Sequence, residues 1–269
     1  MRSQLILRLF SNLISHLPRV KGVGVLISAV AERYKDEPIA LEKAVWGSKM
    51  RFRTNDLIGR MMIFSHNYYD HRERRLIRKL VRKGDFGVDV GANIGIYTLF
   101  LSQLVGEPGK VVAIEAEQNN VNELRRNLAL NTANNVEVHH CGVSDRAEIL
   151  PLLLNTTGNA GGHSFFDQSH ISDPQAQMVR CVPLAAIIGD RRPRFMKLDI
   201  EGYEHRVLAR YFKDVPKALW PEHIMLEDNP GRREQDAVRL CVSNGYRIRR
   251  LIDYNVFLSL GPSVADSHS

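Results

Sequence analysis

The feature that most constrains the fold of this chain is residues 88–98, with the sequence VDVGANIGIYT. The apolar run at 86–90 predicts a buried strand that carries Asp89 near its end. Gly91 and Gly95 predict a tight loop that leads into a helix. Such a loop lets a ligand lie against bare backbone at the carboxyl end of a parallel strand. The segment therefore predicts an α/β fold that binds a nucleotide-like ligand.

The rest of the chain agrees with this fold, because strand and helix patterns alternate after Gly84. Strands separated by helices require crossover connections, so we expect a Rossmann-like, doubly wound, mostly parallel seven-stranded sheet with helices on both faces. An antiparallel C-terminal hairpin, residues 246–252 and 254–260, should add an antiparallel edge strand. The other expected strands are 86–90, 110–114, 136–140, 194–198 and 223–226, and the expected helices are 94–105, 118–131, 203–212 and 232–243.

Two regions are expected along the chain, an N-terminal helical accessory region at 1–70 and the main domain at 71–269. Residues 1–17 carry a helical apolar stripe that polar residues interrupt, so they predict neither a membrane span nor a signal peptide. We expect this helix to pack on the main domain. The alternative is an amphipathic helix that makes peripheral contact with a membrane.

Composition indicates an ordinary, mildly basic globular protein. The 269 residues carry a net charge of +7, and the cysteines Cys141, Cys181 and Cys241 are too few and too far apart for a disulfide framework or a zinc site. We therefore expect a cytoplasmic, possibly membrane-peripheral, enzyme with reduced thiols. The basic face of the helix at 71–83 lacks interleaved aromatic residues, so it predicts a solvated surface rather than a nucleic-acid site.

Residues 148–183 interrupt the alternation of strands and helices. They include a glycine-rich polar stretch at 155–163, and we expect a long insertion that lies over the ligand crevice. His163 lies in this stretch, and we expect it to be a solvated loop residue.

Two positions refine the nature of the ligand. Asn93 replaces the middle glycine of a dinucleotide-binding pattern, which disfavours a nicotinamide-dependent oxidoreductase and suits a smaller zwitterionic ligand. Glu115 ends the second strand, where a carboxylate commonly accepts hydrogen bonds from ribose hydroxyls. A ribose-bearing ligand is therefore expected.

A second acidic motif follows the fourth strand. Asp199 ends that strand beside the same crevice, and Glu201 begins the next turn. Two carboxylates at this edge can serve as a base, as metal ligands or as substrate clamps. The alternative is helix N-capping by Asp199 or a first-turn acid at Glu201, and for Glu204 we prefer such a structural role.

Four motifs together resemble the FkbM family of methyltransferases and stand in that family's order: DVGANIG at 89–95, IE at 114–115, NAGG at 159–162 and KLDIEG at 197–202. The resemblance implies a class I S-adenosylmethionine-dependent methyltransferase fold and, typically, O-methylation of a natural-product or glycan hydroxyl. It implies that Glu115 holds the ribose. Ala116 stands where the family usually has proline, which we expect to affect loop stiffness more than binding. The residues implied to contact the methionine part of the cofactor are Asp89, Gly91, Asn93 and Gly95.

The remaining site residues are less constrained by the motifs. Asp145, near the end of the third strand, is a candidate for binding adenine, with a turn residue as the alternative. Asp199 is the expected base or orienting carboxylate, with Glu201 second. Asp199 with Asp228 and Asn229 is similar to the magnesium site of catechol O-methyltransferase, but a plain turn at 228–231 is the preferred interpretation, so no metal ligand is assigned.

The expected function is an S-adenosylmethionine-dependent O-methyltransferase with a small-molecule, glycan or lipid-linked acceptor. One alternative is an RNA-modifying methyltransferase that uses the basic helix at 72–83, which would bind RNA with strong salt dependence. Another is a non-catalytic cofactor-binding or membrane-scaffold protein. We do not expect a nucleic-acid partner.

Overall fold

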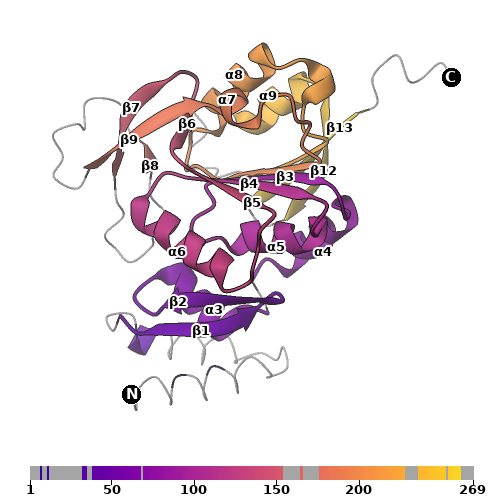
Figure 1. The fold of residues 1–269 in the computed structure, drawn as a ribbon. Helices are drawn as coiled ribbons and strands as arrows, with labels where there is room; N and C mark the ends of the chain where they lie inside the picture. Colours follow the sequence, from indigo (N-terminus) through magenta and orange to yellow (C-terminus); the bar gives the residue numbers. More distant parts are fainter. Residues whose placement is uncertain are drawn as a thin grey trace.

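The computed structural model describes residues 7, 11, 32–34, 38–67, 69–153, 164–165, 176–227, 236–252 and 254–261. Its centre is a seven-stranded sheet with the order β12-β13-β11-β10-β3-β4-β5 (Figure 1). The five strands from β11 to β5 are parallel, which confirms the expected doubly wound class. The strands are β3 (Phe86–Val90), β4 (Lys110–Glu115), β5 (Val136–His140), β10 (Phe195–Leu198), β11 (His223–Glu227), β12 (Tyr246–Ile252) and β13 (Asn255–Leu260).

The predicted C-terminal hairpin forms and provides the expected edge strand, β12, which pairs antiparallel with its neighbour β13. β13 is antiparallel to both neighbours and lies between β11 and β12, so the edge strand β12 runs in the same direction as β11. Burial explains this order. Val256, Phe257 and Leu258 of β13 are all buried, so both faces of this strand need cover. Residues 247–251 of β12 are exposed, which suits an edge.

Helices cover both faces of the sheet (Figure 1). Alternate residues of β3 point to opposite faces, as a strand requires. Val88 and Val90 join the core beneath the helices of one face, whereas Asp89 bonds to Thr98 on a helix of the other. One face carries α7 (Leu184–Ile188), α8 (Glu204–Asp214) and α9 (Ala237–Ser243), and the other carries α4 (His71–Leu80), α5 (Ile96–Val105) and α6 (Gln118–Ala129).

A two-stranded hairpin, which the sequence did not predict, precedes the main sheet. It consists of β1 (Ala40–Val45) and β2 (Ser48–Arg53), and α3 (Leu57–Ser65) follows it. Two helical residues of the N-terminal segment are described, Leu7 and Ser11, and both are fully buried. Lys43 of β1 donates hydrogen bonds to the backbone and hydroxyl oxygens of Ser11, at 3.2 and 2.5 Å. At these positions the segment packs inward, as expected; the rest of the predicted helix lies outside the described residues.

The insertion between the third and fourth strands of the main sheet contains strands of its own. A second sheet has the order β6-β9-β7-β8. Its members are β6 (Gly142–Ser144), β7 (Glu148–Leu153), β8 (Ser164–Phe165) and β9 (Ala176–Pro183). The glycine-rich stretch and His163 lie outside the described residues. Across the described part of the chain, no helix is long and apolar enough to cross a membrane.

Trp46, in the turn of the hairpin, joins the N-terminal region to the main domain. Its ring stacks on Tyr69 at 6.1 Å and meets Tyr97 edge-on at 5.7 Å, and its Nε1 donates to the carbonyl of His66 at 2.9 Å. The guanidinium of Arg74 lies 4.3 Å from the ring centroid. One side chain thus fixes the segment before α4 against α5.

Replacement of this ring should loosen both partners. We expect Trp46→Ala to lower the free energy of unfolding by about 3 kcal/mol, as for other large-to-small aromatic changes. Trp46→Phe keeps ring contacts and loses the hydrogen bond to His66, so about 1 kcal/mol is expected. Urea unfolding of both variants measures the difference. Equal losses would contradict a role for the ring itself.

Candidate functional site

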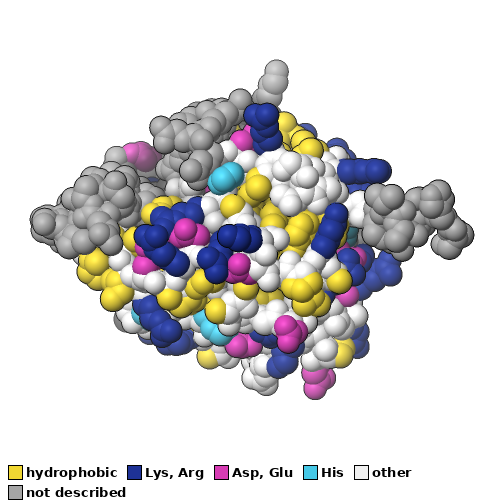
Figure 2. Space-filling model, turned by 90° about the horizontal axis from the view of Figure 1, so that it is seen from above, with side chains coloured by type: hydrophobic (Ala, Val, Ile, Leu, Met, Phe, Trp, Pro, Cys, Tyr) yellow, Lys and Arg dark blue, Asp and Glu magenta, His cyan; other side chains and the backbone are white. Residues whose placement is uncertain are grey.

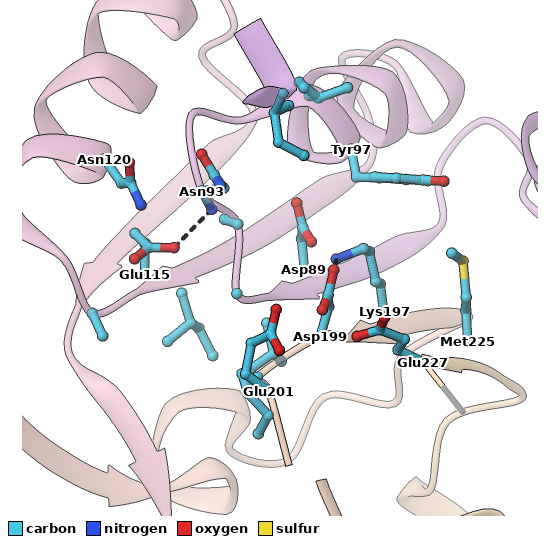
Figure 3. Close-up of a pocket in the computed structure, with 18 of the residues that line it drawn as sticks. Asp89, Asn93, Tyr97, Glu115, Asn120, Lys197, Asp199, Glu201, Met225 and Glu227 are labelled. Atoms are coloured by element: carbon cyan, nitrogen blue, oxygen red, sulfur yellow. Dashed lines mark hydrogen bonds and ion pairs between the residues drawn. The ribbon is translucent and has the colours of Figure 1, made fainter. Parts of the chain in front are cut away.

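The carboxyl ends of the parallel strands surround one cavity of about 340 Å³ (Figure 3). β3, β4, β10 and β11 each contribute residues at this edge, where open α/β sheets bind their ligands. The segment before α4, the residues after β5, Leu152 of β7 and the start of β13 also line the cavity. The cavity is large enough for a small organic ligand.

The glycine loop after β3 has its shape because two backbones approach closely. Gly91 has a φ of +76°, and a Cβ atom there would lie 2.0 Å from the carbonyl oxygen of Asp199. Gly95 has a φ of +92°, and a Cβ atom there would lie 2.4 Å from Cδ1 of Leu124. Gly91 therefore requires glycine both for its φ and for its contact with the backbone that follows β10. Gly95 is favoured by its φ and packs against the end of the Leu124 side chain on α6.

Asn93 links this loop to the end of β4. Its φ of 51° is left-handed, a conformation that Asn tolerates better than most residues. Its backbone N–H donates to Oε2 of Glu115 at 2.7 Å (Figure 3). Its side-chain oxygen accepts from the N–H of Ile94 at 2.6 Å. The backbone and the side chain of Asn93 thus both hold the loop next to Glu115.

Glu115 presents a buried carboxylate at the end of the second strand. The side chain is 8% exposed, and its Oε1 accepts from the N–H of Glu117 at 2.8 Å. Burial raises its pKa, and the hydrogen bonds from Glu117, Asn93 and Asn120 oppose this shift. Since each carboxylate oxygen can accept more than one hydrogen bond, Glu115 can still receive ligand hydroxyls.

Asp89 carries an unsatisfied acceptor. The residue is fully buried, and its Oδ2 accepts from the hydroxyl of Thr98 at 2.6 Å, while its buried Oδ1 has no hydrogen-bond partner. Burial raises its pKa, and the ammonium of Lys197 opposes that shift. Asp89 lines the cavity. Because a buried acceptor without a donor is costly, its position suits a ligand that brings a donor.

Lys197 and Asp199 form an ion pair at the end of β10, with Nζ and Oδ2 2.9 Å apart. Burial disfavours the charged lysine, but the carboxylates of Asp199, Asp89 and Asp70 outweigh burial and raise its pKa. Carboxylate oxygens of Asp199, Glu201 and Glu227 lie within 4.8 Å of one another. Glu201 has a left-handed φ of 56°, as functional loops often do.

The described cavity wall is strongly acidic. Lys197 is the basic residue on it. The opposing carboxylates are those of Asp70, Glu73, Asp89, Glu115, Asp199, Glu201 and Glu227. Such a wall favours cationic or neutral ligand groups over anionic ones.

Several lining residues were not predicted, among them Tyr69, Asp70 and Glu73. These three precede the first strand of the main sheet, so no strand-end rule points to them. The only signal was the polar, aromatic cluster at 67–70, which also resembles a turn.

The predicted adenine contact is not brought to the cavity. Asp145 is absent from the described lining, and its Oδ1 accepts from Nε of Arg206 at 2.6 Å. The strand end there is lined by Cys141, Gly142 and Val143. The turn alternative for Asp145 fits this placement.

Glu204 has the structural role preferred from the sequence. Its two carboxylate oxygens accept from the N–H groups of Ile200 and Gly202, at 2.9 and 3.0 Å. It therefore holds the turn that carries Glu201. Asp228 and Asn229, the other half of the predicted magnesium site, lie outside the described residues.

The sequence of this chain is similar to known methyltransferases. A family model for the methyltransferase FkbM domain matches residues 89–249. The chain is 26% identical over 179 residues to "Methyltransferase 1" of Beauveria bassiana, covering 60% of this chain and 66% of that protein. It is 40% identical over 78 residues to "Methyltransferase sdnD" of Sordaria araneosa, covering 28% and 30%. The matches thus span less than two thirds of these curated relatives.

Two solved methyltransferase structures are also similar to this chain. Methyltransferase FkbM from Methylobacillus flagellatus is 17% identical, with a TM-score of 0.44 and coverage of 88% of this chain and 60% of that one. A SAM-dependent O-methyltransferase from Thermotoga maritima is 12% identical, with a TM-score of 0.45 and coverage of 71% and 66%.

The close contact at Gly91 can be separated from its backbone strain. We expect Gly91→Ala to weaken S-adenosylhomocysteine binding at least about tenfold, because the new Cβ displaces Asp199. Gly84→Ala is the matched control, since Gly84 also has a positive φ, +88°, but has open space around it. The control should cost about 1–2 kcal/mol of stability and leave affinity unchanged. Isothermal titration measures both affinities, and equal values would refute the steric argument.

Proposed function

The chain belongs to the FkbM methyltransferase family, and on that premise we propose that it transfers a methyl group from S-adenosylmethionine to a hydroxyl of a small-molecule, glycan or lipid-linked acceptor. One observation carries this proposal: the cavity joins a cradle built by Gly91, Asn93 and Glu115 to a cluster of carboxylates at the ends of β10 and β11. The cradle suits the cofactor, and the cluster suits an acceptor with hydroxyl groups.

The residues present fit the cofactor in charge and in hydrogen bonding. S-adenosylmethionine carries an ammonium and a sulfonium against one carboxylate, so its net positive charge matches the acidic wall. Oδ1 of Asp89, which lacks a partner, would accept from the ammonium. Glu115 would accept from the ribose hydroxyls. The segment Cys141–Val143 offers backbone and apolar surface for adenine, in place of Asp145.

Asp199 and Glu201 are proposed to orient the acceptor hydroxyl. The cofactor supplies an electrophilic methyl group on a good leaving group, so positioning of the acceptor and exclusion of water account for much of the catalysis. Asp199 is held by Lys197, so it presents a fixed acceptor to a hydroxyl donor. Glu201 stands on a strained turn that Glu204 holds in place.

The acidic wall also bears on the acceptor class. A phosphate-rich acceptor such as RNA would meet repulsion from seven carboxylates in the cavity. Figure 2 shows the face covered by α7, α8 and α9, where Lys and Arg side chains are interspersed with acidic ones, whereas the basic helix α4 lies on the opposite face. A neutral, hydroxyl-bearing acceptor group is therefore favoured.

The test is transfer of labelled methyl from S-adenosylmethionine into fractionated cell extract, with mass spectrometry of the labelled product. We expect an O-methylated, alkali-stable product. Labelled RNA would overturn the proposed acceptor and support an RNA-modifying methyltransferase. Cofactor binding without transfer to any fraction would support a non-catalytic protein.

Cofactor binding is tested separately by titration with S-adenosylhomocysteine. Asp89→Ala and Glu115→Ala should each weaken binding, by roughly tenfold or more, because each removes a buried charged acceptor. Asp145→Ala is the matched control and should leave the affinity unchanged, because Asp145 pairs with Arg206 outside the described cavity wall. Unchanged affinity in the first two variants would overturn the cofactor assignment.

Transfer should not require a divalent metal. The Lys197 ammonium already lies 2.9 Å from Asp199 and supplies positive charge to the cluster that a metal would otherwise bind. We therefore expect full activity in EDTA. If EDTA abolished transfer and magnesium restored it, Asp199, Glu201 and Glu227 would instead be metal ligands.

A further inference from the structure

We propose that Asp70 is the general base that takes the proton from the acceptor hydroxyl, an inference that rests on the proposed O-methyl transfer. Asp70 precedes α4, in the region that the sequence assigned to an accessory role. It lines the same cavity as Asp199 and Lys197. It thus faces the acceptor side from outside the main sheet.

The ordinary explanation for an aspartate at this position is helix capping, and the geometry rules it out. Asp70 occupies the N-cap position of α4, yet its side chain makes no capping hydrogen bond. Its Oδ2 instead accepts from the hydroxyl of Tyr97 on α5 at 2.7 Å. Its φ of 46° is left-handed, an uncommon conformation for a residue with a side chain.

Neighbouring contacts hold Asp70 in this strained conformation. Nη2 of Arg74 donates to the carbonyl of Tyr69 at 3.3 Å, and Trp46 stacks on Tyr69 and meets Tyr97 edge-on. The residue and its hydrogen-bond donor are therefore both fixed by the hairpin. Strain that the surroundings maintain in this way is typical of functional positions.

Asp70 is better suited to accept a proton than Asp199. Protonation of Asp199 would remove the negative charge that stabilises the adjacent Lys197 ammonium at 2.9 Å. Asp70 has a neutral donor, Tyr97, as its direct partner. The other charged groups that act on it are Glu73 and Arg74 of α4 and Lys197 of β10.

The electrostatic surroundings tune Asp70 for this role. Burial raises its pKa to about 6, with Glu73 adding to the shift, and the Tyr97 hydrogen bond, Lys197 and Arg74 oppose it. A base is most effective when its pKa is close to the working pH. Asp70 is therefore ionised at neutral pH and remains basic enough to accept a proton.

The transfer step balances with this assignment. The acceptor oxygen forms a bond to the methyl carbon, the carbon–sulfur bond breaks with its electron pair going to sulfur, and the acceptor proton goes to the Asp70 carboxylate. Asp199 and Lys197 keep their charges throughout.

The experiment compares wild type, Asp70→Asn and Tyr97→Phe by labelled methyl transfer into the acceptor fraction across pH. Asp70→Asn should lose about 10²-fold or more of the rate, the usual contribution of a general base. Asn suits the left-handed conformation, so this variant should fold. Asp214→Asn, an exposed change on α8, is the control and should keep the wild-type rate.

Tyr97→Phe supplies a readout that a structural role would not give. Loss of the hydroxyl removes a hydrogen bond that favours the ionised Asp70, so the acid limb of the rate profile should move above pH 6. Carbon-13 NMR of labelled aspartate, assigned by difference from Asp70→Asn, should show the same upward shift without any acceptor. S-adenosylhomocysteine affinity should change far less than the transfer rate in both variants.

The two proposals fail in distinguishable ways. No transfer by the wild type would overturn the proposed function. Transfer by the wild type with an unchanged rate in Asp70→Asn would overturn only the role of Asp70. An acid limb at the same pH in Tyr97→Phe as in the wild type would also overturn the role of Asp70.

Discussion

The arrangement of the cavity depends on how one buried lysine balances several carboxylates. Carboxylates brought close together away from water repel one another and shift toward their neutral forms. The Lys197 ammonium interacts with Asp199, Asp89 and Asp70, so it offsets this repulsion from the centre of the group. A positively charged ligand adds to the same balance, which links the choice of ligand to the stability of the site. The acidic wall thus carries an excess of negative charge, which a bound cation would balance.

The cavity has two walls that are built by different means. The cofactor cradle is formed by backbone that turns tightly at strand ends, where Gly91 and Asn93 adopt left-handed conformations. The opposite wall depends on side-chain packing, in which Trp46 holds Tyr69 and Tyr97 in place. One wall therefore tolerates almost no change of backbone shape, while the other is determined by which aromatic and acidic side chains are present.

The sequence predicted the first wall well and the second poorly, for a physical reason. Asp89, Glu115 and Asp199 follow from strand-end rules, because parallel strands bring their carboxyl ends to one edge. Asp70 follows from no such rule: its position depends on tertiary packing around Trp46, which local periodicity does not encode. Asp145 was predicted from its closeness to a strand end, but its side chain accepts a hydrogen bond from Arg206 and does not line the cavity. The order of β12 and β13 was missed because alternation reveals a hairpin but not which strand is buried on both faces.

The place of the hairpin in the core limits how this site can change in evolution. The stretch 40–73 supplies the hairpin, Trp46 and the acidic residues before α4, and the stretch from β3 onward supplies the cradle. The two stretches share one buried cluster, in which Met50 and Phe52 of the hairpin pack with Ala92 and Leu124 beside the glycine loop. Exchange of the first stretch would therefore disturb the cradle as well, so recombination at a junction near α4 would not transfer one wall of the cavity as an independent unit.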